Sequence, residues 1–253
     1  MTLTLQIAAY AEWRSRLSAN IAEFQGWLSE NDLSDAQTDL RLSQLLDRLR
    51  EDRLNVAFVA EFSRGKSELI NAIFFGDFGN RILPSSAGRT TMCPTELLYD
   101  PDKTPRIELL PIQTRAANGS VSEYKRYPEE WLMVPVDVDS AEVMHEALGH
   151  VSETLRVTPE EAERLGFELS DGAGSDLYRV GADGLVEIPR WRHAVINFPH
   201  PLLKQGLVIL DTPGLNAIGA EPELTLSLLP NAHAILFILA ADTGVTQSDL
   251  NIW

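Results

Sequence analysis

The stretch that decides the fold is LNVAFVAEFSRGKSELINAIF, residues 54–74. It begins with a short apolar run rich in β-branched and aromatic residues, which is typical of a buried parallel strand. It ends with a run that predicts a helix stopping near Gly76. Between the two, AEFSRGKS fits the phosphate-binding pattern G-x-x-x-x-G-K-[ST], except that Ala60 stands where the first glycine would be. A strand, this loop and a helix together predict a nucleotide site.

The loop residues have separate chemical tasks. Ala60 adds one methyl group at the end of the strand, which we expect to be tolerated. Gly65 allows close backbone approach, so that N–H groups and the helix N-terminus face the phosphates. Lys66 reaches the β and γ oxygens, and Ser67 supplies a hydroxyl ligand for Mg²⁺. The triplet alone also fits a helix start with a surface lysine. The predicted nucleotide contacts are Glu61, Phe62, Ser63, Arg64, Gly65, Lys66, Ser67 and Glu68.

A second signature is LVILDTPGLN, residues 207–216, a buried strand that ends in Asp-Thr-Pro-Gly. Asp211 at the end of this strand can bind Mg²⁺ through water, opposite Ser67. Gly214 can present its backbone N–H to the γ-phosphate. Taken alone, the segment also fits a strand followed by an ordinary turn. The two signatures in this order favour a P-loop nucleotide site over two unrelated turns.

A third segment, LPSSAGRTTMCPTEL, residues 83–97, is rich in glycine and hydroxyl residues. A threonine here can contact Mg²⁺ and the γ-phosphate and so make the loop sensitive to hydrolysis. Thr91 is the first candidate and Thr90 the second, and a plain turn is the alternative. We expect Lys66, Asp211 and Thr91 to converge around one metal-bound triphosphate.

The rest of the chain predicts an α/β fold. GLVIL at 206–210 and AILFILA at 234–240 are further buried strands, and RIELLPIQ places Pro111 near a strand end. Strands that alternate with helices indicate a parallel sheet. Residues 1–53 predict two helices, the second started by a capping box at Ser34 and Gln37. They are either ordinary core helices or an arm that packs outside the nucleotide domain. The first carries an apolar stripe of Tyr10, Trp13, Leu17, Ile21, Phe24 and Leu28.

Composition excludes several classes of function. A formal charge of −16 disfavours binding to nucleic acid and broad adhesion to anionic lipid. Cys93 is the single cysteine, so no internal disulfide can form, and it fits an ordinary small residue in a reducing cytosol. The longest apolar run, AILFILAA, is too short to span a bilayer. His145 and His150 are five apart, which separates their rings on a helix and disfavours a zinc site. These features predict a soluble, cytoplasmic protein.

Three segments, VAEFSRGKSELINAIF, LPSSAGRTTMCPTELLY and HPLLKQGLVILDTPGLN, together resemble the GTPase domain of bacterial dynamin-like proteins. The resemblance implies a P-loop NTPase-type, mostly parallel sheet with helices on both faces, preceded by an N-terminal helical segment. It implies a GTPase that uses GTP and Mg²⁺ and forms a homodimer through its nucleotide face. It also implies a self-assembling, membrane-remodelling protein that lies peripherally at the inner membrane face and contacts lipid through C-terminal parts.

The resemblance also assigns individual roles. Lys66 and Ser67 take the phosphate and Mg²⁺ positions, Asp211 the metal-linked aspartate and Gly214 the γ-phosphate glycine. Thr91 matches the threonine that orients the attacking water. Ser63 matches the serine that places a charge-compensating monovalent cation. The implied catalytic residues are thus Thr91, Ser63 and Lys66, and the metal ligands are Ser67, Thr91 and Asp211.

Two further positions bear on the reaction. Leu215 follows Gly214, where small GTPases carry a glutamine that orients water; its absence agrees with the resemblance, which implies that loop backbone, the switch threonine and dimerisation take this role. Arg64 lies inside the loop, and such an arginine could neutralise charge in the transition state. We hypothesise that Arg64→Ala lowers turnover with little loss of GTP affinity; a surface arginine facing a partner is the alternative.

The predicted domains are a helical arm at 1–53 and a dynamin-type GTPase domain at 54–253. The long separation of Thr91 from Asp211 predicts an insertion at about 115–195. The guanine-reading pattern [NT]-K-x-D does not occur before Trp253, so we expect the domain to be incomplete at its C-terminus, and GTP over ATP rests on the resemblance alone. Alternative functions are a nucleotide-gated interaction module with little turnover, or a P-loop NTPase of another group. Acidic charge and the helical arm count against a ribosome-assembly role.

Overall fold

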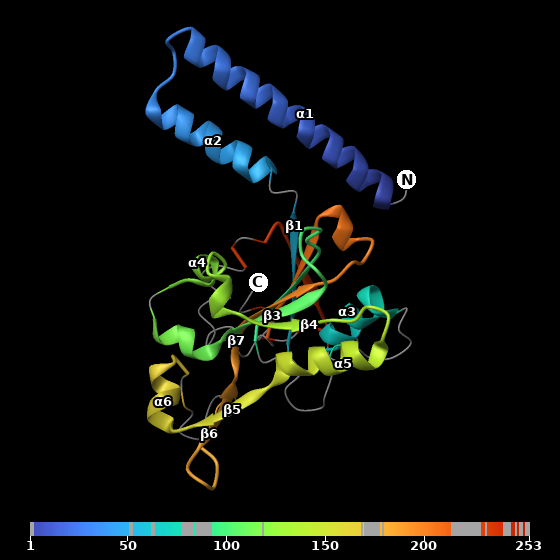
Figure 1. Cartoon of the computed structure of the whole chain (residues 1–253), viewed down its shortest axis with the longest axis vertical. Coiled ribbons are helices and arrows are strands. Elements are labelled where there is room, and N and C mark those ends of the chain that lie inside the picture. Colours follow the sequence, from blue (N-terminus) through green and yellow to red (C-terminus); the bar gives the residue numbers. More distant parts are fainter. Residues whose placement is uncertain are drawn as a thin grey trace. The chain divides into compact units, whose positions relative to one another are not determined.

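The computed structural model describes residues 3–50, 53–61, 64–76, 83, 93–117, 119–167, 169, 178, 180–213, 229–230, 232–239, 244–245, 247 and 250. The chain divides into two compact units, Met1–Leu54 and Asn55–Trp253, and each is described here by itself (Figure 1). Within the described part of the chain, no helix combines the length and the apolar character that crossing a membrane requires.

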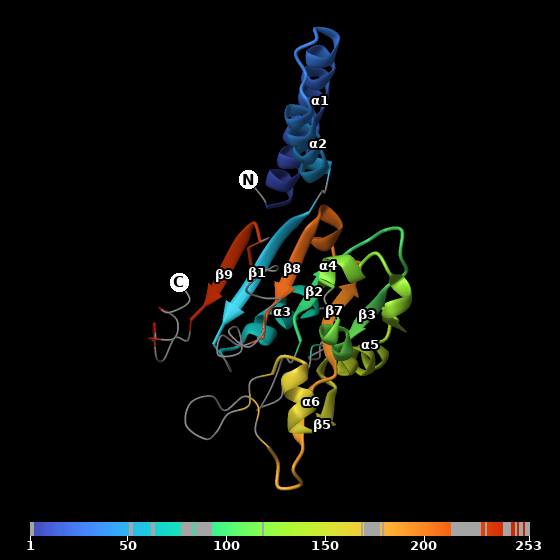
Figure 2. The same ribbon diagram turned by 90° about the vertical axis from the view of Figure 1, so that its left-hand side faces the viewer.

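The first unit is a pair of helices, α1 (Leu3–Glu30) and α2 (Ala36–Arg50), which pack side by side (Figure 2). Leu28 and Leu46 are buried between them, and Gln25 donates a hydrogen bond to Ser43 at 3.4 Å. The two predicted helices are therefore confirmed. The aromatic members of the predicted stripe on α1 are about half exposed: Tyr10, Trp13 and Phe24, together with Trp27.

The predicted capping box at the start of α2 is wrong. Asp35, rather than Ser34, caps this helix, because its carboxylate accepts the backbone N–H groups of Gln37 and Thr38, both at 2.9 Å. The Thr38 hydroxyl donates to the same carboxylate at 2.7 Å. The helix begins at Ala36, one residue later than a cap at Ser34 requires, and a carboxylate also favours the positive end of the helix dipole.

The second unit is built on a seven-stranded sheet with the order β4-β3-β7-β2-β8-β1-β9. β1 pairs with β9, and β2 with β7, in parallel, whereas β2–β8, β3–β7 and β3–β4 are antiparallel. The α/β class is confirmed, with a mixed sheet. The strands are β1 (Leu54–Ala60), β2 (Thr95–Leu98), β3 (Arg106–Pro111), β4 (Leu132–Pro135), β7 (Trp191–Asn197), β8 (Leu207–Asp211) and β9 (Ala234–Ile238).

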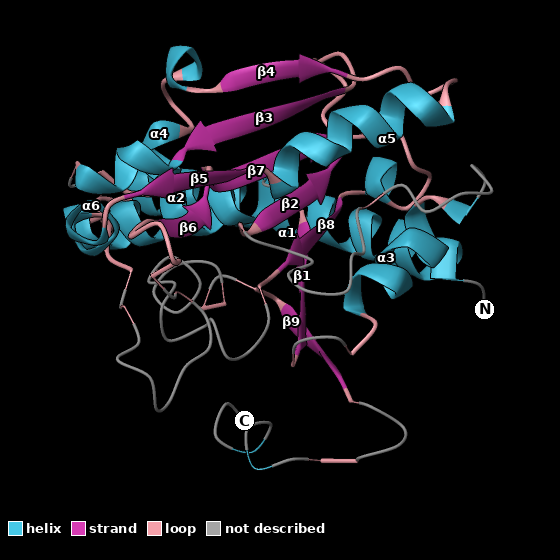
Figure 3. Cartoon of the chain, turned by 90° about the horizontal axis from the view of Figure 1, so that it is seen from below, coloured by secondary structure: helices cyan, strands magenta, loops and turns pink. Residues whose placement is uncertain are grey.

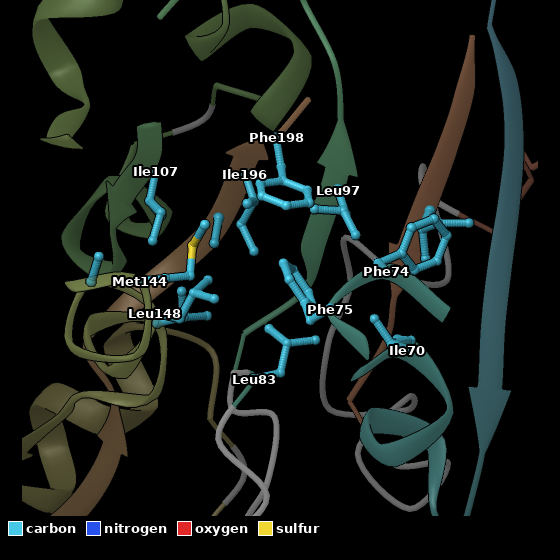
Figure 4. Close-up of a cluster of buried hydrophobic side chains, with 14 of the residues drawn as sticks. Ile70, Phe74, Phe75, Leu83, Leu97, Ile107, Met144, Leu148, Ile196 and Phe198 are labelled. Atoms are coloured by element: carbon cyan, nitrogen blue, oxygen red, sulfur yellow. The ribbon is translucent and has the colours of Figure 1, made fainter. Parts of the chain in front are cut away.

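Helices cover both faces of this sheet, as predicted. α3 (Lys66–Phe74) and α5 (Ala141–Gly149) lie on one face, and the short α4 (Val121–Tyr124) lies on the other (Figure 3). Alternating residues of each strand point to opposite faces, so Phe58 joins one core while Ala57 and Val59 join the second. In the larger core, side chains of α3 and α5 meet those of β2, β3 and β7 (Figure 4).

A smaller subdomain is formed by the residues that lie between α5 and β7 in the sequence. Its two antiparallel strands are β5 (Thr154–Val157) and β6 (Val186–Pro189), and α6 (Pro159–Arg164) follows β5. Thr158 caps α6 and Pro159 is its first residue, as the sequence predicted. Phe167 and Tyr178 pack at a ring distance of 4.8 Å in a separate core that also contains Val186 and Ile188. The other short helices among the described residues are η2 (Ile112–Ala116), η3 (Pro128–Glu130), η4 (His150–Ser152) and η5 (Leu203–Gln205).

Candidate functional site

The loop between β1 and α3 is the first part of the site. β1 ends at the fully buried Ala60, and α3 begins at Lys66. Gly65 caps the helix in the left-handed region, with φ 81° and ψ 15°. A Cβ at Gly65 would meet no atom within 4 Å, so the backbone conformation, rather than space, requires glycine here. The chain thus turns sharply into a helix whose first N–H groups are suited to an anion.

Lys66 lies against the end of β8. Its ammonium donates hydrogen bonds to the carboxylate of Asp211 and to the backbone carbonyl of Thr212. Lys66 and Asp211 are each only 7% exposed. β1 and β8 are neighbours in the sheet and run in the same direction, so their carboxyl ends share one edge (Figure 2). Two residues 145 positions apart are thereby brought together, as the sequence predicted.

Thr212 is a residue that the sequence analysis did not single out. Its hydroxyl donates to the carbonyl oxygen of Phe58 in β1 at 2.9 Å, and the residue is almost fully buried. This hydrogen bond ties the end of β8 to the strand that leads into the phosphate loop. On the other side of β8, Thr95 of β2 pairs with Asp211. The Asp-Thr-Pro-Gly stretch indicated a turn, and nothing in it indicated this contact.

The donor atoms around Lys66 fit a magnesium ion. Ser67 is buried in the first turn of α3, next to Lys66, and contributes a hydroxyl oxygen. Asp211 contributes a carboxylate at the same edge of the sheet. Mg²⁺ prefers such oxygen ligands and is commonly held by one or two of them together with water and substrate phosphates. Glu68 also lies in this first turn, where a negative side chain is favoured by the helix dipole.

Glu61 and Arg64 form an ion pair inside the loop. The Arg64 Nη2 and Nε atoms lie 2.5 Å and 3.1 Å from the same oxygen, Oε2 of Glu61. The side chains are 16% and 13% exposed, respectively. Both residues were predicted to contact nucleotide, but their mutual pairing was not foreseen.

Asn71 of α3 is a second buried polar residue that the sequence analysis missed. Its side-chain amide donates to the carbonyl oxygen of Leu83 at 3.0 Å and accepts the N–H of Leu83 at 2.7 Å. Leu83 begins the glycine- and hydroxyl-rich segment, which is therefore attached at that point to the helix of the phosphate loop. Further along the segment, Cys93 is buried and its thiol donates to the carbonyl oxygen of Val151 at 3.7 Å. An asparagine within a helical pattern gives no separate signal for such a contact.

Several predicted site residues lie outside the described residues. They are Phe62 and Ser63 in the phosphate loop, Thr90 and Thr91 in the segment before β2, and Gly214 after β8. The roles assigned to them stay predictions.

Comparison with known proteins adds an independent line of evidence. The model of the dynamin family matches residues 56–252. A bacterial dynamin-like protein of Nostoc punctiforme (strain ATCC 29133 / PCC 73102) is 26% identical over 230 residues, which cover 91% of this chain and 26% of the relative. The isoniazid-induced protein IniA of Mycobacterium tuberculosis is 35% identical over 85 residues, which cover 33% of this chain and 12% of that protein.

A solved structure shows an oligomerised bacterial dynamin pair, described as providing a mechanism for the long-range sensing and tethering of membranes. The similarity covers 97% of this chain and 30% of the solved chain. The identity is 17% and the TM-score 0.47. The chain spans about a quarter of the length of the Nostoc relative. The family match covers well over half of the chain and includes both the phosphate loop and the end of β8 at Asp211. The chain therefore belongs to the dynamin family.

Proposed function

We propose that residues 54–253 form a GTPase domain that binds GTP with Mg²⁺ and hydrolyses the γ-phosphate bond, with residues 1–53 as a helical arm. The observation that carries this proposal is the meeting of Lys66 and Asp211 at the sheet edge where β1 and β8 end. A flexible cation and a carboxylate at that edge are the two charges that a metal-bound triphosphate needs. Family membership supports the choice of GTP.

Binding of the triphosphate changes the partners of Lys66. In the structure its ammonium is held by Asp211 and the Thr212 carbonyl, and we infer that it moves to the β and γ oxygens when nucleotide binds. Asp211 would then be able to hold Mg²⁺ through water, together with the Ser67 hydroxyl and Thr91. The metal ion, when bound, neutralises charge on the β and γ oxygens. The N–H groups at the start of α3 complete the cradle.

Hydrolysis requires a positioned water and compensation of charge. In our proposal Thr91 orients the water, the Gly214 N–H holds a γ-phosphate oxygen, and Ser63 places a monovalent cation. The water oxygen bonds to the γ-phosphorus as the bond to the bridging oxygen breaks, which yields GDP and inorganic phosphate. Because Leu215 stands where small GTPases use glutamine, the water must be oriented by the loop segments.

We further propose that the protein self-associates across its nucleotide face and acts peripherally at the inner membrane face. Both statements rest on family membership and on the likeness to a bacterial dynamin-like protein. Self-association would bring a second copy against the loops that complete each site. Lipid contact is assigned to other parts of the whole protein rather than to the residues of this site.

Hydrolysis of GTP and ATP by the full-length protein, with Mg²⁺ and with or without lipid vesicles, tests this function. We expect GTP to be hydrolysed in preference to ATP, and vesicles to raise the rate. Preference for ATP would contradict the assignment of GTP. Tight GTP binding without turnover in any condition would indicate a nucleotide-gated interaction module instead.

A further inference from the structure

We infer that Glu61 and Arg64 form a clasp that holds the phosphate loop in its binding shape, so that Arg64 is a positioning residue. This inference rests on the proposed GTP site and adds a positioning role for two residues of its loop. The clasp is the ion pair of Glu61 and Arg64.

The clasp joins the two ends of the phosphate loop. Glu61 directly follows the buried end of β1, and Arg64 directly precedes Gly65, the cap of α3. Two nitrogens of the guanidinium, Nε and Nη2, meet one carboxylate oxygen at 3.1 Å and 2.5 Å. The ion pair therefore links the first residue after β1 to the residue before the helix cap of α3.

Partial burial strengthens the attraction between the two charges of the clasp. The Arg64 and Glu61 side chains are 16% and 13% exposed, so salt and water screen their attraction much less than they screen a surface pair. Charge-assisted hydrogen bonds from a planar guanidinium also fix direction as well as distance. An ion pair with these properties restricts how far the end of β1 and the start of α3 can move apart.

A restricted backbone matters because the phosphates are bound by backbone N–H groups. If the loop is ordered before nucleotide arrives, the entropy of ordering it is not lost on binding, and affinity rises. The clasp thus acts on nucleotide affinity through the shape of the loop. It has no net charge, so it contributes little field of its own at the phosphates.

The same geometry weighs against Arg64 as a charge supplied to the transition state. Its guanidinium is bonded to Glu61, and it would have to leave that carboxylate to reach a phosphate oxygen. The two roles make opposite predictions. A transition-state charge affects turnover and spares affinity, whereas the clasp affects affinity and spares turnover.

The test is a double-mutant cycle with Glu61→Gln, Arg64→Met and the double variant of the full-length protein. Glu61→Gln keeps the size of the side chain and removes its charge, and Arg64→Met keeps an unbranched, shorter side chain and removes the guanidinium. The affinity for a non-hydrolysable GTP analogue is measured by calorimetry, and kcat is measured at saturating GTP. We expect each single variant to bind the analogue about five- to tenfold more weakly and the double variant to be no weaker than either single, as for residues in direct contact. The fold-change in kcat should be smaller than the fold-change in affinity.

The charge-reversed variant E61R/R64E keeps the opposite charges and tests the pairing directly. We expect it to recover most of the lost affinity. The chain offers a matched control in Glu161 and Arg164, an ion pair with the same sequence spacing on α6, at 3.1 Å and largely exposed. Glu161→Gln and Arg164→Met should leave the affinity unchanged.

Unchanged affinity in Glu61→Gln and Arg64→Met, or additive losses in the double variant, would overturn the clasp. A fall of kcat in Arg64→Met at unchanged affinity would do so too, and would assign Arg64 to the reaction. Failure of the wild-type protein to bind the analogue would contradict the proposed function instead, so the two failures are distinguishable.

Discussion

At the end of β8, Thr212 joins the two strands that carry the charged residues of the site. Its hydroxyl bonds to the Phe58 carbonyl in β1, and its own carbonyl accepts the Lys66 ammonium. A single buried side chain thus helps to set the position of Asp211 relative to the phosphate loop. A small polar residue directly after a strand can therefore have a positioning role as well as a structural one.

Replacing Thr212 by the isosteric valine should lower both stability and nucleotide affinity. The change removes a buried hydrogen bond, which costs about 1 kcal/mol or somewhat more, and frees the strand end that carries Asp211. Urea unfolding and calorimetric titration with GTP would measure the two effects. Thr114→Val is the matched control, because the Thr114 hydroxyl also donates to a backbone carbonyl, that of Pro111, at 2.7 Å. It should lose similar stability and keep its affinity for GTP; equal loss of affinity in both variants would argue against a specific role of Thr212.

Among the elements, β2 and β7 share a buried charge network beneath α4. Glu96 of β2 is almost fully buried, and one of its carboxylate oxygens lies 3.0 Å from Nε2 of the fully buried His193 in β7. Lys125, which follows α4, donates to both carboxylate oxygens at 2.6 Å and 2.8 Å. Burial alone would raise the pKa of Glu96, but the hydrogen bond from His193 and the charge of Lys125 outweigh it and hold this pKa well below its usual range.

This lowered pKa predicts how stability depends on pH. Because the carboxylate is favoured in the folded state, its contribution is present above the unfolded pKa of about 4.3 and is lost as the pH falls below that value. Glu96→Gln should lower the free energy of unfolding at pH 7 by about 1–3 kcal/mol and flatten its decline below about pH 5. Urea unfolding from pH 7 to below about pH 5 measures this free energy, with Glu146→Gln, at an exposed position, as the control. If the free energy of unfolding of Glu96→Gln fell below about pH 5 as steeply as that of the wild-type protein, this assignment would be contradicted.

For the whole molecule, the sequence predicted what depends on local patterns. The strand, loop and helix of 54–74 and the strand ending at Asp211 have strong local signals, and the meeting of Lys66 with Asp211 followed from the rule that parallel neighbours end at one edge. The antiparallel placing of β2 beside β8 could not be read from the sequence, because pairing direction depends on contacts between distant segments. The hydrogen-bond partners of Asn71, Thr212 and Arg64 could not be predicted either, since a polar residue in a regular pattern gives no signal of which group it will contact.

The meeting of Lys66 and Asp211 is also the central claim about function, and equilibrium binding of GTP with Mg²⁺ tests it most directly. The comparison is between the wild-type protein, Lys66→Ala and the control Lys103→Ala, which removes a half-exposed lysine paired with Glu108. Our account predicts that Lys66→Ala weakens binding by about a hundredfold or more, since it removes charge-assisted hydrogen bonds to the phosphates, and that Lys103→Ala binds as the wild type does. Wild-type affinity in a folded Lys66→Ala variant would contradict the account.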